Sequence, residues 1–116
     1  MLVIFHVDKE ENWGLAIGNI RNMLRYGKEQ QEEFHIELLA NSKAVKQYVN
    51  HTTEKDGLAA AFQELLAEGV DICACHNALN SLHIQEEDLI KGIRVVPAGV
   101  VELAQRQQEG YSYIKP

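Results

Sequence analysis

The sequence has 116 residues and a mass of 13.1 kDa, so we expect a single domain over residues 1–116. Its content of 46% hydrophobic and 24% charged residues excludes disordered and fibrous classes. A net charge of −6, with no basic run, excludes a nucleic-acid interface and disfavours binding to an anionic membrane surface.

The first third of the chain predicts strand, helix and strand. Residues 2–7 form a short apolar run, which is typical of a strand buried on both faces. Gly27 is the expected end of the helix that follows, and residues 34–40 form the next apolar strand. Apolar side chains recur at helical spacing at Trp13, Ile17, Ile20 and Leu24.

The middle of the chain predicts two further helices separated by a polar segment. Asn41 and Ser42 are expected N-caps of a short helix. Residues 51–56 are polar, and the helix after them ends near Gly69. The apolar positions of these two helices are Ala44, Val45, Tyr48 and Val49 in the first, and Leu58, Phe62, Leu65 and Leu66 in the second.

The last third continues the same alternation. Residues 70–75 are the third expected strand, and a short helical turn covers residues 77–82. A fourth strand at 93–96, a helix at 97–108 with proline in its first turn, and a last strand at 111–114 follow. This order predicts an α/β fold, a three-layer α/β/α sandwich with a mostly parallel sheet of about five strands, of the size of a flavodoxin-like domain.

The sequence also predicts where the protein resides. No apolar stretch approaches the roughly 20 residues of a membrane span. The first apolar run lacks preceding basic residues and is followed by Asp8 and Glu10, unlike a signal peptide. Two cysteines separated by one alanine cannot form the disulfide framework of a secreted scaffold. We therefore expect a cytoplasmic protein.

Polar and reactive residues gather where the predicted strands end. In open parallel sheets, ligands bind beyond the carboxyl ends of the strands. His6 and Asp8 follow the first strand, Asn41 the second, and Cys75 and Asn77 the third. These five residues are the candidate site.

Cys75 is the candidate nucleophile. It lies at a strand end just before a helix start, where free N–H groups and the helix dipole favour a thiolate. The alternative is a buried structural cysteine. Cys73 lies two residues earlier on the same strand face but deeper in the sheet, where a cysteine is normally an inert small hydrophobe.

Four segments resemble the DsrE/DsrF-like sulfur-relay family, in particular its small, single-domain, uncharacterised branch. They are GVDICACHNALNSLHI, LVIFHVD, LLANSKAVK and VVPAGVVELAQRQQEGYSYIKP, and together they cover most of the chain. The resemblance implies a DsrEFH-like fold without a cofactor, in which Cys75 accepts sulfur as a persulfide and His6, Asn41 and Asn77 line the cleft. It also implies a homo-oligomer, a trimer or hexamer.

The sequence departs from that family in two places. Relatives often carry glycine after the polar residue of the second-strand turn, where this chain has Ser42 after Asn41. No tail with a further cysteine exists to accept sulfur internally, so a relay needs donor and acceptor proteins as partners.

The other site residues have two interpretations each. His6 activates the Cys75 thiol if their strands are neighbours, or is satisfied by a backbone carbonyl. Asp8 orients His6, or caps a helix. Asn41 and Asn77 donate amide hydrogens to an anionic sulfur ligand, or serve as ordinary N-caps.

Metal and phosphate sites are weaker alternatives. Cys73, Cys75, His76 and His83 lie within eleven residues and suit zinc or copper, but their spacing fits no common zinc signature, so we expect no metal. Helix N-termini favour anions, yet the chain has no GxGxxG or GxxxxGK[ST] loop. The GxSxG motif of α/β-hydrolases is also missing.

Two functional hypotheses remain from the sequence. The first is a sulfur carrier or sulfurtransferase-like protein that acts through Cys75. The second is a non-catalytic oligomeric binding or scaffold protein that uses the same cleft for a small anion or a partner. A subunit contact is expected among apolar residues near the C-terminus, namely Val100, Val101, Leu103, Tyr111 and Tyr113.

Overall fold

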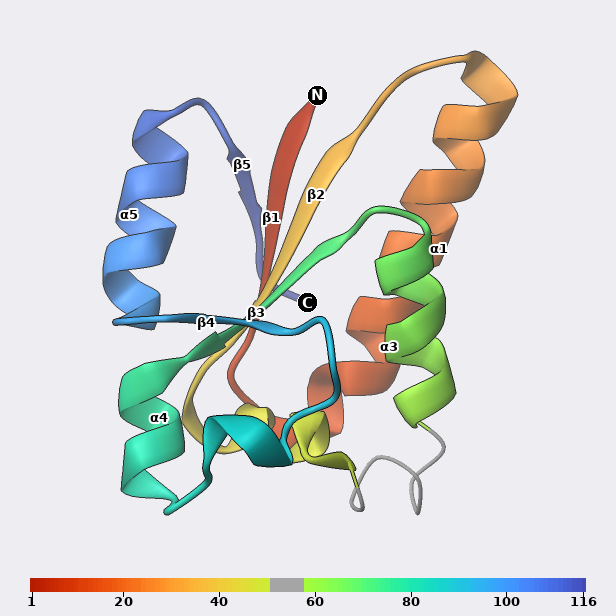
Figure 1. The fold of residues 1–116 in the computed structure, drawn as a ribbon. Helices are drawn as coiled ribbons and strands as arrows, with labels where there is room; N and C mark the ends of the chain where they lie inside the picture. The colour runs from red at the N-terminus through yellow and green to blue at the C-terminus, as the bar shows by residue number, and fades with distance from the viewer. Residues whose placement is uncertain (51–57) are drawn as a thin grey trace.

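The computed structural model describes residues 1–50 and 58–116; the polar segment at 51–56 lies outside the described residues. Its sheet has five strands in the order β4-β3-β2-β1-β5, and every pair is parallel, which confirms the predicted α/β sandwich (Figure 1). The strands are β1 (Leu2–Val7), β2 (His35–Ala40), β3 (Asp71–Cys75), β4 (Arg94–Val96) and β5 (Ser112–Ile114).

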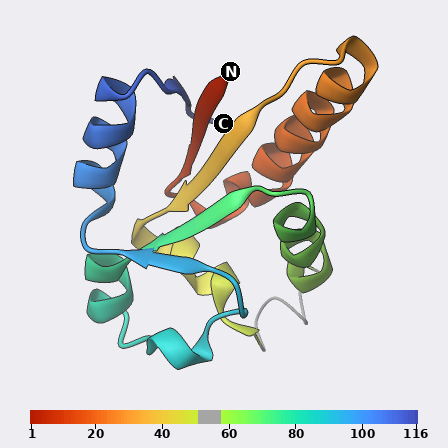
Figure 2. The same cartoon turned by 45° about the horizontal axis from the view of Figure 1, so that its top comes forward.

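Helices cover both faces of the sheet. Helices α1 (Trp13–Gln30) and α3 (Leu58–Ala67) lie on one face, and α5 (Gly99–Gln108) lies on the other, with α4 (His76–Ser81) beside its N-terminal end (Figures 1 and 2). None of the helices in the described part has the length and apolar character to cross a membrane. Short 3₁₀ helices complete the chain: η1 (Glu10–Asn12), η2 (Ser42–Tyr48) and η3 (Glu86–Asp88).

Strand alternation divides the interior into two clusters of unequal size. The larger lies under α1 and α3, where Trp13, Tyr48 and Phe62 pack edge to face or tilted, with ring centroids 4.9–5.2 Å apart. The smaller lies under α5 and comprises Ile4, Leu39, Cys73 and Val96. The α5 face is therefore less apolar, and it holds the polar residues discussed below.

The predicted end of α1 at Gly27 is wrong. The helix continues to Gln30 and ends on Gln31, whose φ of 53° is left-handed and whose N–H donates to the Gly27 carbonyl. Gly27 is instead a point of close approach. A Cβ at this position would lie 2.7 Å from the carbonyl oxygen of Glu32 and 2.9 Å from the Phe34 ring. The glycine allows the returning chain to pass against the helix.

Candidate functional site

The carboxyl ends of the central strands lie at one level and form a pocket. Val7 pairs with Ala40, Ala40 with Ala74, and Cys75 with Val96. The cavity beyond them, called here the Cys75 pocket, has a volume of about 390 Å³. Its lining residues are Asn41, Ser42, Lys43, Cys75, Asn77, Ala78, Ser81, Leu82, Ala98, Gly99 and Val100.

Cys75 lies where β3 passes directly into α4. It is the last residue of the strand and the N-cap position of the helix, and its side chain is 6% exposed. The backbone N–H of Gly99, the first residue of α5, donates a hydrogen bond of 3.2 Å to its Sγ. A Cβ at Gly99 would lie 3.3 Å from the Cys75 Cβ and 3.5 Å from the Sγ. Glycine therefore lets the start of α5 approach the sulfur closely.

Asn41 lines the pocket and does not cap a helix. It occupies the N-cap position of η2, but its side chain makes no capping hydrogen bond. The amide Oδ1 instead accepts a hydrogen bond of 2.9 Å from Nε2 of His6. Ser42 follows with a φ of 53°, a conformation that favours glycine. This geometry gives a physical reason for the glycine expected after the polar residue in relatives.

Asn77 also lines the pocket. Helix α4 begins at His76 with Cys75 in the N-cap position, so Asn77 is the second helical residue and the predicted N-cap role is wrong. The helix therefore starts one residue earlier than the sequence pattern indicated.

His6 lies on the α5 face of β1, and both of its ring nitrogens are engaged. Nε2 donates to Asn41, and Nδ1 lies 2.6 Å from the Tyr113 hydroxyl. A direct pair between His6 and Cys75 requires neighbouring strands. Strand β2 lies between β1 and β3, so this condition is not met. The partners of the buried ring are two side chains rather than a backbone carbonyl.

Asp8 is directed to the end of the chain. Its Oδ1 lies 2.9 Å from Nζ of Lys115. The hydrogen bond from Lys115 is the main reason that the pKa of the Asp8 carboxyl lies below its usual range. The N-cap position of η1 is Lys9, so Asp8 does not cap that helix. Neither Asp8 nor His6 is among the residues that line the Cys75 pocket.

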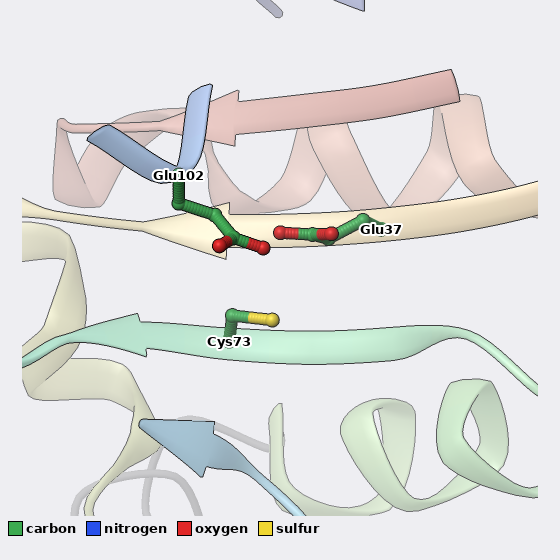
Figure 3. Close-up of side chains that lie close together, drawn as sticks. All are labelled: Glu37, Cys73 and Glu102. Carbon is green, nitrogen blue, oxygen red and sulfur yellow. The ribbon is translucent and has the colours of Figure 1, made fainter. Parts of the chain in front are cut away.

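Cys73 lies in a charged cluster that the sequence analysis missed. Its Sγ and the carboxylates of Glu37 and Glu102 lie within 4.8 Å of one another (Figure 3). Nη2 of Arg94 is 3.1 Å from the Cys73 Sγ, and Nε of Arg106 is 2.8 Å from Glu37. The two guanidinium groups thus bring positive charge to the acidic cluster. The set Cys73, Cys75, His76 and His83 forms no ligand group in the part of the chain that the structure describes.

Burial controls protonation in this cluster. It raises the pKa of the Cys73 thiol, and the charges of Glu37 and Asp71 raise it further, so the thiol stays protonated at neutral pH. Burial, with the neighbouring Glu102 carboxylate, also raises the pKa of Glu37 to about 7. A charged residue inside the apolar strand 34–40 was the sequence signal for this cluster.

The apolar residues predicted to include a subunit contact divide into two groups. Val100, Val101 and Tyr113 are exposed, by 70%, 50% and 40%. Leu103 and Tyr111 are partly buried against the smaller core cluster. Val100 also lines the Cys75 pocket, so exposed apolar surface adjoins its mouth.

Comparisons with known proteins agree with this fold. The model of the DsrE/DsrF-like family matches residues 3–116. No curated protein matches the chain. The solved structure of MTH1491 from Methanobacterium thermoautotrophicum, a protein of unknown function, is 33% identical with a TM-score of 0.86, covering 99% of this chain and 98% of that one.

A second structure, the ychN protein from E. coli, is 17% identical with a TM-score of 0.76 and covers 100% of this chain and 99% of its own. A third, BT1422 from Bacteroides thetaiotaomicron, also of unknown function, is 17% identical with a TM-score of 0.72 and covers 99% and 94% of the two chains. At this identity, the two structures show the shared fold.

Proposed function

Because this chain belongs to the DsrE/DsrF-like family, we propose that it carries sulfane sulfur as a persulfide on Cys75 and passes it to an acceptor thiol. Family membership implies a role related to sulfur relay. The observation that carries the specific proposal is the position of Cys75, which lines a pocket beyond the strand ends and whose Sγ accepts the backbone N–H of Gly99.

The proposed reaction has two displacement steps. The Cys75 thiolate attacks the terminal sulfur of a donor persulfide, R–S–SH. The donor S–S bond breaks, its electron pair leaves with the donor as RS⁻, and Cys75 holds Sγ–SH. An acceptor thiolate then attacks that outer sulfur, which forms the acceptor persulfide and returns the Cys75 thiolate. No external oxidant or reductant is needed, because each step exchanges one S–S bond for another.

The pocket has groups suited to an anionic sulfur. The Gly99 N–H contacts the Sγ, and Lys43, Asn41 and Asn77 contribute a cation and two amides to the lining. Hydrogen bonds to a charged acceptor are stronger than neutral ones, so these donors stabilise a thiolate or a persulfide anion. The same groups also stabilise the negative charge that develops on the donor sulfur as it leaves as RS⁻.

The acceptor thiol belongs to another molecule. The chain has two cysteines, and Cys73 is sealed in the sheet with its thiol protonated. Transfer therefore needs a donor and an acceptor that reach the pocket mouth. We propose that the exposed Val100 and Val101 beside this mouth lie in a contact with a partner subunit or a relay protein.

The experiment separates the two half-reactions. The protein is incubated with a low-molecular-weight persulfide, desalted, weighed by intact mass spectrometry, and then mixed with a thiol acceptor. The proposal predicts a gain of one sulfur atom that the acceptor removes. Cys75→Ser abolishes the gain, and the matched control Cys73→Ser keeps it.

The low exposure of Cys75 favours one competing function, a non-catalytic oligomeric protein whose cleft binds a small anion or a partner. In that case, Cys75 takes up no sulfur in the native protein and reacts only after unfolding. This outcome would reject sulfur carriage and favour the binding of a small anion or a partner in the cleft.

A further inference from the structure

A chain of hydrogen bonds connects β5 to the Cys75 pocket. The Tyr113 hydroxyl lies 2.6 Å from Nδ1 of His6, and Nε2 of the same ring lies 2.9 Å from Oδ1 of Asn41. The amide oxygen has no hydrogen to donate, so Nε2 must carry the proton. A neutral His6 ring therefore accepts at Nδ1 from the Tyr113 hydroxyl, and a single tautomer satisfies both contacts.

The Asn41 amide is turned with its oxygen toward His6. His6 does not line the pocket, whereas Asn41 itself does. The amide is planar, so its nitrogen lies on the opposite branch from the oxygen. No hydrogen bond from this nitrogen to any other residue is found in the described ranges 1–50 and 58–116. The amide nitrogen of this pocket-lining residue is therefore free to bind a ligand.

Asn41 lies beside the reactive sulfur. Its Cβ is 3.4 Å from the position that a Cβ on Gly99 would occupy, and the Gly99 N–H donates to the Cys75 Sγ at 3.2 Å. A sulfur atom attached to Sγ adds about 2 Å to the side chain, which extends it into a space bordered by these residues.

We propose that His6 is a positioning residue: it holds Asn41 with its amide nitrogen toward the Cys75 pocket, which selects small anionic sulfur compounds over neutral ones. This inference rests on the proposed function for the nature of the ligand. If the Nε2 proton is lost, the amide can turn over and present its oxygen, which repels an anion. His6 therefore acts through Asn41 and needs no contact with the sulfur.

The test compares alkylation of Cys75 by anionic iodoacetate and neutral iodoacetamide in the full chain with Cys73→Ser. The readout is the ratio of the two rates. His6→Leu and Asn41→Ala should each lower the ratio about three- to tenfold, the range of a single hydrogen bond. His6→Gln, whose amide nitrogen can donate as Nε2 does, should restore it.

The double variant distinguishes positioning from a general structural effect. If His6 acts only through Asn41, adding His6→Leu to Asn41→Ala leaves the ratio unchanged. An additive decrease, or a wild-type ratio in His6→Leu alone, would overturn the inference. Thermal unfolding of each variant checks that the fold is retained.

Nitrogen-15 NMR of the His6 ring provides an independent result that does not need a reactive thiol. The expected spectrum shows a proton on Nε2 and none on Nδ1; a proton on Nδ1 alone would overturn the inference. The two proposals fail separately. No sulfur uptake by the wild type refutes sulfur carriage, whereas uptake with an unchanged iodoacetate ratio in His6→Leu refutes the positioning role.

Discussion

Cys73 and Cys75 lie two residues apart on the same face of β3, yet their surroundings differ in almost every respect. Cys73 is fully buried under α5 among Glu37, Asp71 and Arg94. Cys75 ends the strand, borders a cavity and receives a backbone N–H. A single residue of the strand, Ala74, separates a thiol enclosed by carboxylates from one that borders a ligand-sized cavity.

The difference shows that position along the strand decides the surroundings of each cysteine in this fold. Within the sheet, neighbouring carboxylates and burial raise the pKa of Cys73 and leave it protonated. At the carboxyl end, the start of α5 meets Cys75 with an N–H group, and Gly99 permits the approach. A thiol can exchange sulfur only in the second setting.

Native alkylation should show the largest contrast between the two thiols. We expect Cys75 to react with iodoacetamide at least about a thousandfold faster than Cys73, because the reaction needs thiolate and access. Peptide mass spectrometry of samples taken over time measures both rates. Comparable alkylation rates for Cys73 and Cys75 in the folded protein would show that their different surroundings do not control their reactivity.

Removing a cation from the Cys73 cluster should destabilise the fold strongly. Arg106→Ala removes the closer of the two guanidinium partners of the buried Glu37 and leaves only Arg94, at 3.8 Å, at a cost of about 3 kcal/mol in the free energy of unfolding. Arg21→Ala is the matched control, because it breaks an exposed pair with Glu64 and should cost under about 1 kcal/mol. Urea unfolding measures both, and equal losses would show that the cluster is not energetically distinct.

Glu37 should make stability depend on pH near neutrality. Its pKa in the fold, about 7, exceeds the ordinary value of 4.5, so its stabilising contribution is complete below the ordinary value and is lost as pH rises through about 7. The pKa of Glu102 is shifted downward, so its contribution is lost only on acidification. Relative to Glu37→Gln, the free energy of unfolding of the wild type should fall by about 1–3 kcal/mol between about pH 5 and about pH 8. Parallel stability curves over this range would contradict the assignment.

A methyl group at the start of α5 should have the smallest effect. Gly99→Ala places a Cβ 3.5 Å from the Cys75 Sγ and crowds the space for an outer sulfur. We expect sulfur loading to slow about three- to tenfold, equivalent to about 1 kcal/mol. Gly14→Ala, which adds the same methyl group to α1 where no heavy atom lies within 4 Å, is the control and should load normally.

Local patterns were sufficient to predict the order of the elements. Apolar runs and helical periodicity indicated the strands and helices because each buries a continuous face. The prediction of a helix end at Gly27 is wrong, since this glycine makes a close contact with Glu32 that no local pattern contains. Of the two interpretations of Asn77, the N-cap is wrong because α4 follows β3 without a loop.

The site was predictable only where it depends on strand ends. The grouping of Cys75, Asn41 and Asn77 follows from the parallel sheet, whose carboxyl ends meet. The contact between His6 and Tyr113 requires β5 to pair with β1, and the last strand of the sequence carries no sign of its position. The Cys73 cluster likewise joins residues from β2, β3, β4 and α5.

The most direct test of this account quantifies both cysteine peptides in one sample after the native protein is treated with inorganic polysulfide. We expect one added sulfur atom on the Cys75 peptide and none on the Cys73 peptide of the native protein. Cys73 should gain sulfur only after unfolding. Sulfur on Cys73 in the folded protein, or none on Cys75, would contradict this account.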